Sequence, residues 1–321
     1  MTKAPDGHLI SENDSPILKS NSGENGFVSQ SLEVNKYPQT TTVTVIDNHT
    51  VTSGRRQEKG RSHRLPGAII IGVRKGGTKA LIEFLNIHPQ VVAATDEMHF
   101  FSDDDNYGQG MHWYLNKMPM SLPDQITMEK TPKYFISQAA PDRIHSMNSS
   151  IRLVLALRNP VTRVISDFAQ RVENMGDTGR NFTEYVLDNT TWEVKQDVLC
   201  LTISIYHLHL ARWLQLFPLK QIHIVDGDRL ISEPLEELKG VERFLGIPRY
   251  FSEEVVYFNA TRGFYCMKKK VHGLYTASCL GATKGRDHPH VEGWVRDKLV
   301  RYFDTHNEKL FRMIGRRFNW S

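Results

Sequence analysis

The sequence predicts an α/β fold built on a mainly parallel sheet that is flanked by helices. Three mainly apolar runs, at residues 68–73, 151–157 and 221–225, predict strands, and the first is a continuous apolar run, as expected of a strand covered on both faces. Stretches with apolar residues at helical spacing separate these runs. Strands that alternate with helices in this way are typical of a parallel sheet.

The first half of the fold can be read element by element. The strand at 68–73 ends in a glycine-bearing turn, and a helix follows with apolar residues at helical spacing: Ala80, Leu81, Phe84 and Leu85. A second short strand is predicted at 91–94. The third strand, 151–157, ends shortly before Pro160, a residue that suits the first turn of a helix.

The second half of the chain continues the alternation. Isoleucines and leucines between Ile203 and Leu216 predict one long amphipathic helix. The strand at 221–225 follows, and then a helix that runs through Phe244. We see no internal repeat, so one folded domain accounts for this part of the chain.

The composition changes near residue 65. Residues 1–64 are rich in Ser, Thr, Asn, Gly and charge, and they hold too few apolar groups to offset the entropy lost on folding. We therefore predict a disordered or stalk-like segment at 1–64 and a folded domain at 65–321. We interpret the basic stretch that ends the first segment as a solvated linker. The alternative is a segment that binds an anionic polymer or lipid surface electrostatically.

Length and charge exclude several classes of protein. The chain has 321 residues, a formal net charge of +4 and three cysteines. Three cysteines are too few for a disulfide scaffold, and +4 is a mild bias that does not indicate a nucleic-acid partner. No apolar run is long enough for a membrane-spanning helix, and no signal peptide is visible.

The most informative stretch is the turn at residues 72–80. It follows a buried strand and opens a helix, where backbone N–H groups and the helix dipole favour an anion. Gly76 and Gly77 let the backbone approach that anion closely, and Thr78 can cap the helix or bond an oxygen. Three cations add positive charge: Arg74, Lys75 and Lys79. The turn predicts an anion site, and a glycine turn with surface lysines is the weaker alternative.

This turn is not a Walker A motif, because Thr78 stands where the P-loop lysine should be. The third strand also ends in Arg158, where a magnesium-dependent nucleotidase would need an acid. We therefore expect an anion held by protein cations rather than by a metal ion. Arg158 and Ser166, two helical turns further on, form a second candidate anion site, with a salt-bridged arginine as the alternative.

Seven separated motifs occur in one order along residues 65–320: IIIGVRKGGTKALIEFL, EMHFF, MEKTPKYF, IRLVLALRNPVTRVISDFAQ, HIVDGDRLI, TRGFYC and TKGRDHP. In these the chain resembles the heparan sulfate glucosamine 3-O-sulfotransferases, most closely the type-1 and type-5 branch. The resemblance implies a single P-loop-like sulfotransferase domain with a central parallel sheet. It also implies 3′-phosphoadenosine 5′-phosphosulfate (PAPS) as sulfuryl donor, heparan sulfate as acceptor and no metal ion.

The resemblance assigns roles to individual residues. The catalytic residues would be Glu97 as base, with Lys75, His99 and Lys130. The donor would be held by Lys75, Gly76, Gly77, Thr78, Lys79, Arg158, Ser166, Lys284, Gly285, Arg286, Asp287 and His288. The acceptor would be held by Arg74, Lys79, Glu97, His99, Lys130, Lys133 and Gln170.

The chemistry explains why a base is needed. A sugar hydroxyl is a poor nucleophile, and sulfuryl transfer, like phosphoryl transfer, depends mainly on positioning and charge stabilisation. Glu97 follows the strand at 91–94 and so emerges near the anion site. The histidines show no metal-binding spacing, so we expect no metal. His99 could instead orient the base, bind acceptor or be a half-buried structural residue.

Three positions depart from the family pattern. Lys79 replaces an arginine and so loses the bidentate fork. Ser102 replaces a catalytic-site aspartate of the type-1 enzymes, and the adjacent Asp103 could point elsewhere. Asn159 replaces a common acid with little expected effect. The serine at position 102 is expected either to weaken the activity or to change the acceptor preference.

The cysteines and sequons bear on the compartment. The resemblance implies a disulfide between Cys266 and Cys279, and two free thiols are the alternative. Cys200 lies in an apolar run and is predicted to be buried and free. N-glycosylation sequons begin at Asn13, Asn48, Asn148, Asn181, Asn189 and Asn259. Together these favour a secretory lumen, and the resemblance implies the Golgi lumen, although the chain shows no signal or anchor. We also expect a monomer.

Two rival functions remain at this point. One is a metal-dependent nucleotide kinase or hydrolase on a similar sheet, which the absent lysine and the absent strand-end acid disfavour. The other is a heparan sulfate-binding protein of the same fold with weak or lost catalysis, which only Ser102 favours.

Overall fold

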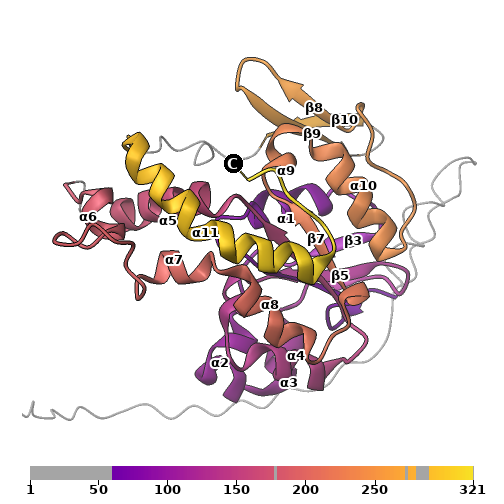
Figure 1. Cartoon of the computed structure of the whole chain (residues 1–321). Coiled ribbons are helices and arrows are strands. Elements are labelled where there is room, and N and C mark those ends of the chain that lie inside the picture. Colours follow the sequence, from indigo (N-terminus) through magenta and orange to yellow (C-terminus); the bar gives the residue numbers. More distant parts are fainter. Residues whose placement is uncertain (1–59, 177–178, 272–273, 280–288, 321) are drawn as a thin grey trace, which may run out of the picture. The chain divides into compact units, whose positions relative to one another are not determined.

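A five-stranded parallel sheet forms the centre of the computed structural model, which describes residues 60–176, 179–271, 274–279 and 289–320. The strand order is β3-β5-β2-β6-β7 (Figure 1). The bounds are β2 Ala68–Gly72, β3 Val91–Ala93, β5 Ile126–Lys130, β6 Arg152–Leu157 and β7 Ile222–Asp226. The predicted α/β class and parallel sheet are confirmed.

Strand β5 is the strand of the central sheet that the sequence prediction missed. It lies between β3 and β2, so it is a central strand, and four of its five residues are buried. Its sequence is Ile-Thr-Met-Glu-Lys, in which polar residues interrupt the apolar run that a buried strand usually shows. The two polar residues at its end, Glu129 and Lys130, contribute contacts to the candidate site described below.

Alternate residues of the central strands face two different cores. Ile70 and Val154 pack with Phe84 of α1 (Thr78–Leu85) and Leu238 of α10 (Pro234–Leu245). Their neighbours in the strands face the opposite core, which contains Trp213 of α8 (Tyr206–Leu214). Both faces of the sheet are therefore covered, as the continuous apolar strands predict.

The remaining helices and short strands complete the chain. The further α-helices are α2 Asp104–Gly108, α3 Gly110–Lys117, α4 Ala140–Met147, α5 Pro160–Met175, α6 Phe182–Val186, α7 Leu199–Ile203, α9 Arg229–Ser232 and α11 Gly293–Ile314. The 3₁₀ helices are η1 Phe100–Ser102, η2 Pro132–Ile136 and η3 Leu219–Gln221. The further strands are β1 Ser62–His63, β4 Met120–Ser121, β8 Val256–Asn259, β9 Phe264–Val271 and β10 Leu274–Ser278.

The helix predicted between residues 203 and 216 is shorter in the structure: α8 spans Tyr206–Leu214, and a separate helix, α7, ends at Ile203. The break falls at Ser204 and Ile205, between the two helices. The hydroxyl of Ser204 accepts a hydrogen bond at 2.5 Å from Nε of Arg163, which is fully buried in α5. The carbonyl of Cys200, a buried free cysteine as predicted, accepts another bond from this guanidinium. Satisfying a buried arginine accounts for a break that hydrophobic spacing alone does not show.

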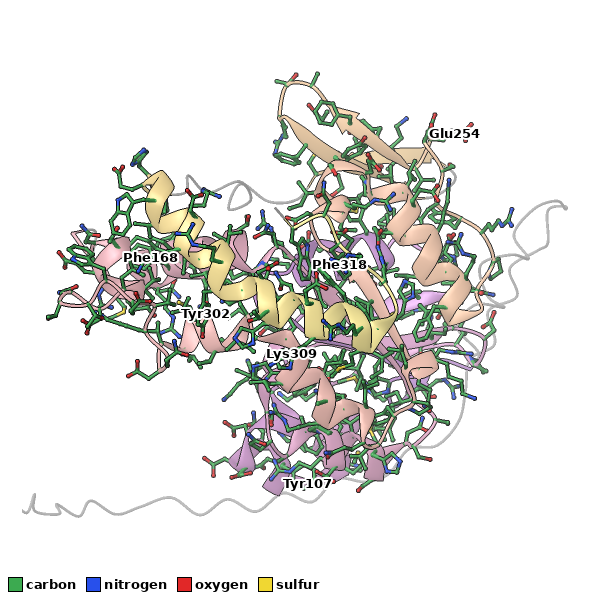
Figure 2. All side chains as sticks on the ribbon, in the orientation of Figure 1. Tyr107, Phe168, Glu254, Tyr302, Lys309 and Phe318 are labelled. Atoms are coloured by element: carbon green, nitrogen blue, oxygen red, sulfur yellow. A yellow bond between two sulfur atoms is a disulfide. The ribbon has the colours of Figure 1, made fainter. Side chains whose placement is uncertain are left out.

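Helix α11 lies along one side of the domain, with contacts to both α5 and α8 (Figure 1). A third apolar cluster lies between this helix and α5, and it includes Phe168 with Tyr302 packed at its margin (Figure 2). Beyond α11, the guanidinium of Arg316 donates a hydrogen bond at 3.1 Å to the carbonyl of Ile224 on β7. Since β7 is an edge strand, this contact covers one of its unpaired carbonyls.

The folded part of the chain begins before the predicted boundary at Leu65. Ser62 and His63 pair with the short strand β4, and the His63 ring bonds the carbonyl of Met118 at 2.6 Å. The Arg64 side chain donates to the carbonyl of Ser121. These residues were assigned to the stalk by composition, but backbone pairing needs no apolar side chains.

A three-stranded antiparallel sheet, β10-β9-β8, follows α10 along the chain. A disulfide joins Cys266 on β9 to Cys279 just after β10, so it ties the base of this hairpin. The loop predicted to cover the donor, residues 284–288, lies outside the described residues.

Candidate active site

The glycine turn between β2 and α1 lies against the ends of two neighbouring strands. A Cβ at Gly76 would collide with the carbonyl oxygen of Ala156 on β6. A Cβ at Gly227, which follows β7, would lie 2.8 Å from the Leu157 carbonyl and closer still to that of Gly76. Gly77 has φ +95°, in the region that favours glycine. The backbone itself therefore forms the cradle, with little room for side chains.

Thr78 is the first residue of α1 and is 5% exposed. The N-cap is Gly77, which has no side chain to accept from the first turn. The prediction that Thr78 caps the helix is therefore wrong. Backbone N–H groups at this helix start remain available to an anion, because the first turn of any helix leaves four without intrahelical partners.

Two of the three cations of the loop have a partner on helix α5. The ammonium of Lys75 donates to Oε1 of Gln170 on α5 at 3.2 Å. Nε of Arg74 lies 3.1 Å from Oδ1 of Asp167, which is itself fully buried. Helix α5 therefore orients both side chains. Lys79 extends outward, and its side chain is 64% exposed with only Glu83 near it, at 3.9 Å.

The second candidate anion site lies at the end of β6. Nε of Arg158 is 2.9 Å from a carboxylate oxygen of Asp228, and the backbone N–H of Asn159 donates to the other oxygen at 2.7 Å. Asn159 in turn caps α5 with its side chain. Ser166 lies two turns along that helix and is half-buried. The pairing with Asp228 orients the guanidinium of Arg158, and sequence reasoning did not predict this partner.

The candidate base has two titratable neighbours. Glu97 follows β3 and its side chain is 39% exposed, while Lys130 is the last residue of β5 and its side chain is only 8% exposed. The Lys130 ammonium donates a hydrogen bond to Oε1 of Glu97, and Nε2 of His99 lies 3.6 Å from Oε2. The structure thus brings together three of the four predicted catalytic residues.

The fourth predicted catalytic residue, Lys75, belongs to the glycine turn after β2. Lys130 pairs with Ile70 of β2, two residues before Gly72 begins that turn. The ends of β5 and β2 are therefore adjacent, at the edge of the sheet where ligands bind in parallel α/β folds. The base and the anion cradle share this edge.

The serine that departs from the family pattern lies close to the base. Ser102 is half-buried, and its hydroxyl lies 3.4 Å from the carbonyl of His99. Asp103 accepts a hydrogen bond from the Asn106 N–H and so serves as the N-cap of α2. Asp103 is thus committed to the helix and does not replace the missing aspartate. Lys133 is exposed on η2.

A cavity of about 490 Å³ opens beside Glu97. It lies between the end of β3 and helix α3, and its lining includes Thr95, Asp96, Glu97, Asn106, Trp113 and Lys117. Over the described residues, no group of three or more His, Cys, Asp or Glu side chains could hold a metal ion.

Glu129 is a buried carboxylate that the sequence interpretation missed. It accepts hydrogen bonds from three hydroxyls: Tyr114 at 2.7 Å, Tyr134 at 2.9 Å and Thr131 at 3.0 Å. Burial raises its pKa to about 6, although the three hydroxyls and Lys130 oppose the shift. An acid inside the motif Met-Glu-Lys-Thr-Pro was the available signal, and it was assigned no role.

Comparison with known proteins shows what the chain is similar to. Residues 65–314 match the sulfotransferase domain family. The chain is 50% identical to human heparan sulfate glucosamine 3-O-sulfotransferase 5 over 260 residues, covering 80% of this chain and 74% of that protein. It is 44% identical to human heparan sulfate glucosamine 3-O-sulfotransferase 3B1 over 266 residues, covering 81% of this chain and 66% of that protein.

The fold also has a counterpart among solved structures. A sulfotransferase from Alicyclobacillus acidocaldarius superposes with a TM-score of 0.60, over 79% of this chain and 98% of that one. At 17% identity this similarity shows a shared fold.

Proposed function

Because the chain belongs to the heparan sulfate glucosamine 3-O-sulfotransferase family, we propose that it transfers a sulfuryl group from PAPS to the 3-hydroxyl of glucosamine residues in heparan sulfate. The observation that carries this proposal is the pair Glu97–Lys130 at the sheet edge that also holds the glycine turn. A carboxylate base and an anion cradle at one edge are the two parts that this transfer needs.

The residues present fit a nucleotide with several anionic groups. A Cβ at Gly76 would collide with the Ala156 carbonyl, and Gly77 has φ +95°, so these glycines let backbone N–H groups approach the 5′ end of the donor. Lys75, Thr78 and Lys79 would complete the 5′ site. Arg158 and Ser166 would hold the 3′-phosphate, and the segment Lys284-Gly285-Arg286-Asp287-His288 would cover the nucleotide.

When bound, PAPS would supply the sulfuryl group, and 3′-phosphoadenosine 5′-phosphate would be the anionic leaving group. Glu97 would accept the proton of the attacking sugar hydroxyl at Oε2, since Oε1 is occupied by Lys130. Lys130 keeps this carboxylate oriented, and His99 lies where it can fix the second oxygen. A positioned base typically contributes roughly 10²–10⁴-fold to the rate. Lys75 would stabilise the charge on the departing phosphate.

The acceptor is a polyanion, and the exposed cations around the edge suit it. Arg74 is held through Nε by Asp167, which leaves its two terminal nitrogens directed away from that contact. Lys79 and Lys133 are exposed, and Gln170 bridges to Lys75. We assign these four to acceptor binding, in a protein that works as a monomer.

The binding-only alternative needs a damaged catalytic site. Ser102 is the one change that favours it, yet the contacts among Glu97, Lys130 and His99 are formed. The structure therefore offers no support for lost catalysis. A metal-dependent kinase or hydrolase is also disfavoured, because the end of β6 carries Arg158 rather than an acid.

We assign the protein to the Golgi lumen. The disulfide between Cys266 and Cys279 suits an oxidising compartment. Sequons at Asn181 and Asn189 lie at exposed positions, so glycosylation would not disturb the core. No helix in the portion of the chain that the structure describes is long and apolar enough to cross a membrane.

The experiment is a transfer assay with radiolabelled PAPS and heparan sulfate, followed by disaccharide analysis of the product. Sulfate at the 3-position of glucosamine supports the proposal. Binding of heparin without any transfer would favour the binding-only alternative. Mg²⁺-dependent ATP turnover without PAPS binding would favour the kinase or hydrolase.

A further inference from the structure

The carboxylate of Glu129 is completely enclosed, directly beside the catalytic residues. It is 0% exposed, and successive side chains of β5 point to opposite faces, so it points away from Lys130. One oxygen accepts from the hydroxyls of Tyr114 and Tyr134, and the other accepts from the hydroxyl of Thr131. Burying an ionisable carboxyl is costly, so a role beyond packing needs consideration.

Thr131 connects this carboxylate to the loop that carries the base. Its Oγ1 accepts a hydrogen bond from the backbone N–H of Met98 at 3.1 Å and lies 3.4 Å from the N–H of His99. These two amides directly follow Glu97 in the chain. A threonine hydroxyl has one proton to donate, and here it is donated in the hydrogen bond to Glu129. The lone pairs of Oγ1 therefore face the loop.

The loop has a strained residue at this point. His99 has φ +52°, in the left-handed region that is unfavourable for residues other than glycine. Strained backbone of this kind persists only where surrounding contacts over-determine it. The hydrogen bonds to Thr131 Oγ1 are such contacts, and Ser102 N–H donating to the His99 carbonyl at 3.1 Å is another.

We propose that Glu129, acting through the hydroxyl of Thr131, is a positioning residue for sulfuryl transfer that fixes the backbone of the Glu97–His99 loop. The inference rests on the proposed function. Lys130 bonds the side chain of Glu97, and Thr131 accepts from the backbone N–H groups that follow Glu97 in the loop. The residues at the end of β5 therefore orient the base at two points. Neither contact depends on the donor or the acceptor being bound.

A carboxylate serves this purpose better than a neutral group. Hydrogen bonds to an ionised acceptor are roughly twice as strong as neutral ones, and they polarise the donor hydroxyl so that it accepts more strongly in turn. Thr131 donates to Oε2 of this carboxylate, whereas the two tyrosine hydroxyls donate to Oε1.

The test separates positioning from stability by removing different hydroxyls around the same carboxylate. Thr131→Val removes the link to the loop, Thr131→Ser retains it, and Tyr114→Phe removes a hydroxyl that contacts Glu129 alone among the hydrogen bonds described. We expect Thr131→Val to lower kcat about 10-fold or more, since misplacement of a reacting group by 1 Å can cost about 10²-fold. KM for PAPS should stay within about twofold, because the cradle is untouched.

The controls make the outcome decisive. Thr131→Ser should restore kcat, and Tyr114→Phe should lower the melting temperature as much as Thr131→Val while keeping wild-type kcat. Glu129→Gln should lower kcat in the same direction as Thr131→Val. The inference is refuted if Thr131→Val keeps full kcat, or if Tyr114→Phe loses as much activity as Thr131→Val.

Hydrogen exchange provides a readout that does not need activity. Amides of Met98 and His99 should exchange at least about 10-fold faster in Thr131→Val than in the wild type, with no such change in Tyr114→Phe. If the wild type transfers no sulfate but this pattern holds, the proposed function fails and the positioning contact stands. Unchanged exchange in Thr131→Val would overturn the inference whatever the enzyme does.

Discussion

Replacing Gly227 by alanine tests the close approach that builds the anion cradle. Its Cβ would lie 2.8 Å from the carbonyl oxygen of Leu157 and closer still to that of Gly76. Both are backbone atoms, so no side-chain rotation relieves the contact. Ordinary van der Waals contact begins near 3.4 Å, so the Gly76 carbonyl of the turn must move by about 1 Å.

The expected effect is on the nucleotide more than on folding. Overpacking of this kind costs about 1–3 kcal/mol, and the flexible partner here is the glycine turn, so we expect affinity for 3′-phosphoadenosine 5′-phosphate to fall about 10–100-fold. Isothermal titration calorimetry on the folded variant measures this. Gly108→Ala is the matched control, because a Cβ there meets nothing within 4 Å and affinity should not change. Unchanged affinity in folded Gly227→Ala would refute the reasoning.

Three further predictions follow from other contacts. Asp228→Asn removes the negative charge that orients Arg158, so KM for PAPS should rise about 10-fold while kcat changes less. An unchanged KM in a kinetic assay would count against a role for Asp228 in orienting Arg158. Burial, then Arg316 and Arg243, lower the pKa of His223 from 6.5 to about 4. The unfolded chain therefore takes up a proton at higher pH than the folded chain, and the free energy of unfolding should fall by up to about 3 kcal/mol between pH 7 and pH 4. The midpoint of urea unfolding should depend less on pH in His223→Gln than in the wild type. Replacing both Cys266 and Cys279 by alanine removes a disulfide that joins residues 13 apart in the chain, and this should cost about 3 kcal/mol of stability, seen as a lower melting temperature. An unchanged melting temperature would contradict a stabilising role for this disulfide.

Local sequence signals predicted most of the fold. The continuous apolar strand β2 is buried on both faces, β6 and β7 lie where strands were predicted, and Pro160 begins α5 as expected. The resemblance stated from the motifs is confirmed by the family match and by relatives up to 50% identical. Strand β5 could not be predicted by hydrophobicity, because its last residues serve the site rather than the core.

The site was only partly predictable, for a different reason. Residue types and motifs indicated Glu97, Lys130 and Arg158, but their partners depend on contacts between distant parts of the chain. Asp228 lies 70 residues from Arg158, and Thr131 reaches a loop 33 residues before it. No periodicity or spacing encodes such pairs, so only the folded topology identifies them.

The most direct test of the account compares the wild type with Glu97→Gln in sulfate transfer from radiolabelled PAPS to heparan sulfate. We predict 3-O-sulfated glucosamine from the wild type. The variant should lose about 10²–10⁴-fold in kcat, because the amide cannot take the proton of the sugar hydroxyl, while heparin binding stays intact. Equal transfer by both proteins would contradict the assignment of Glu97 as the base.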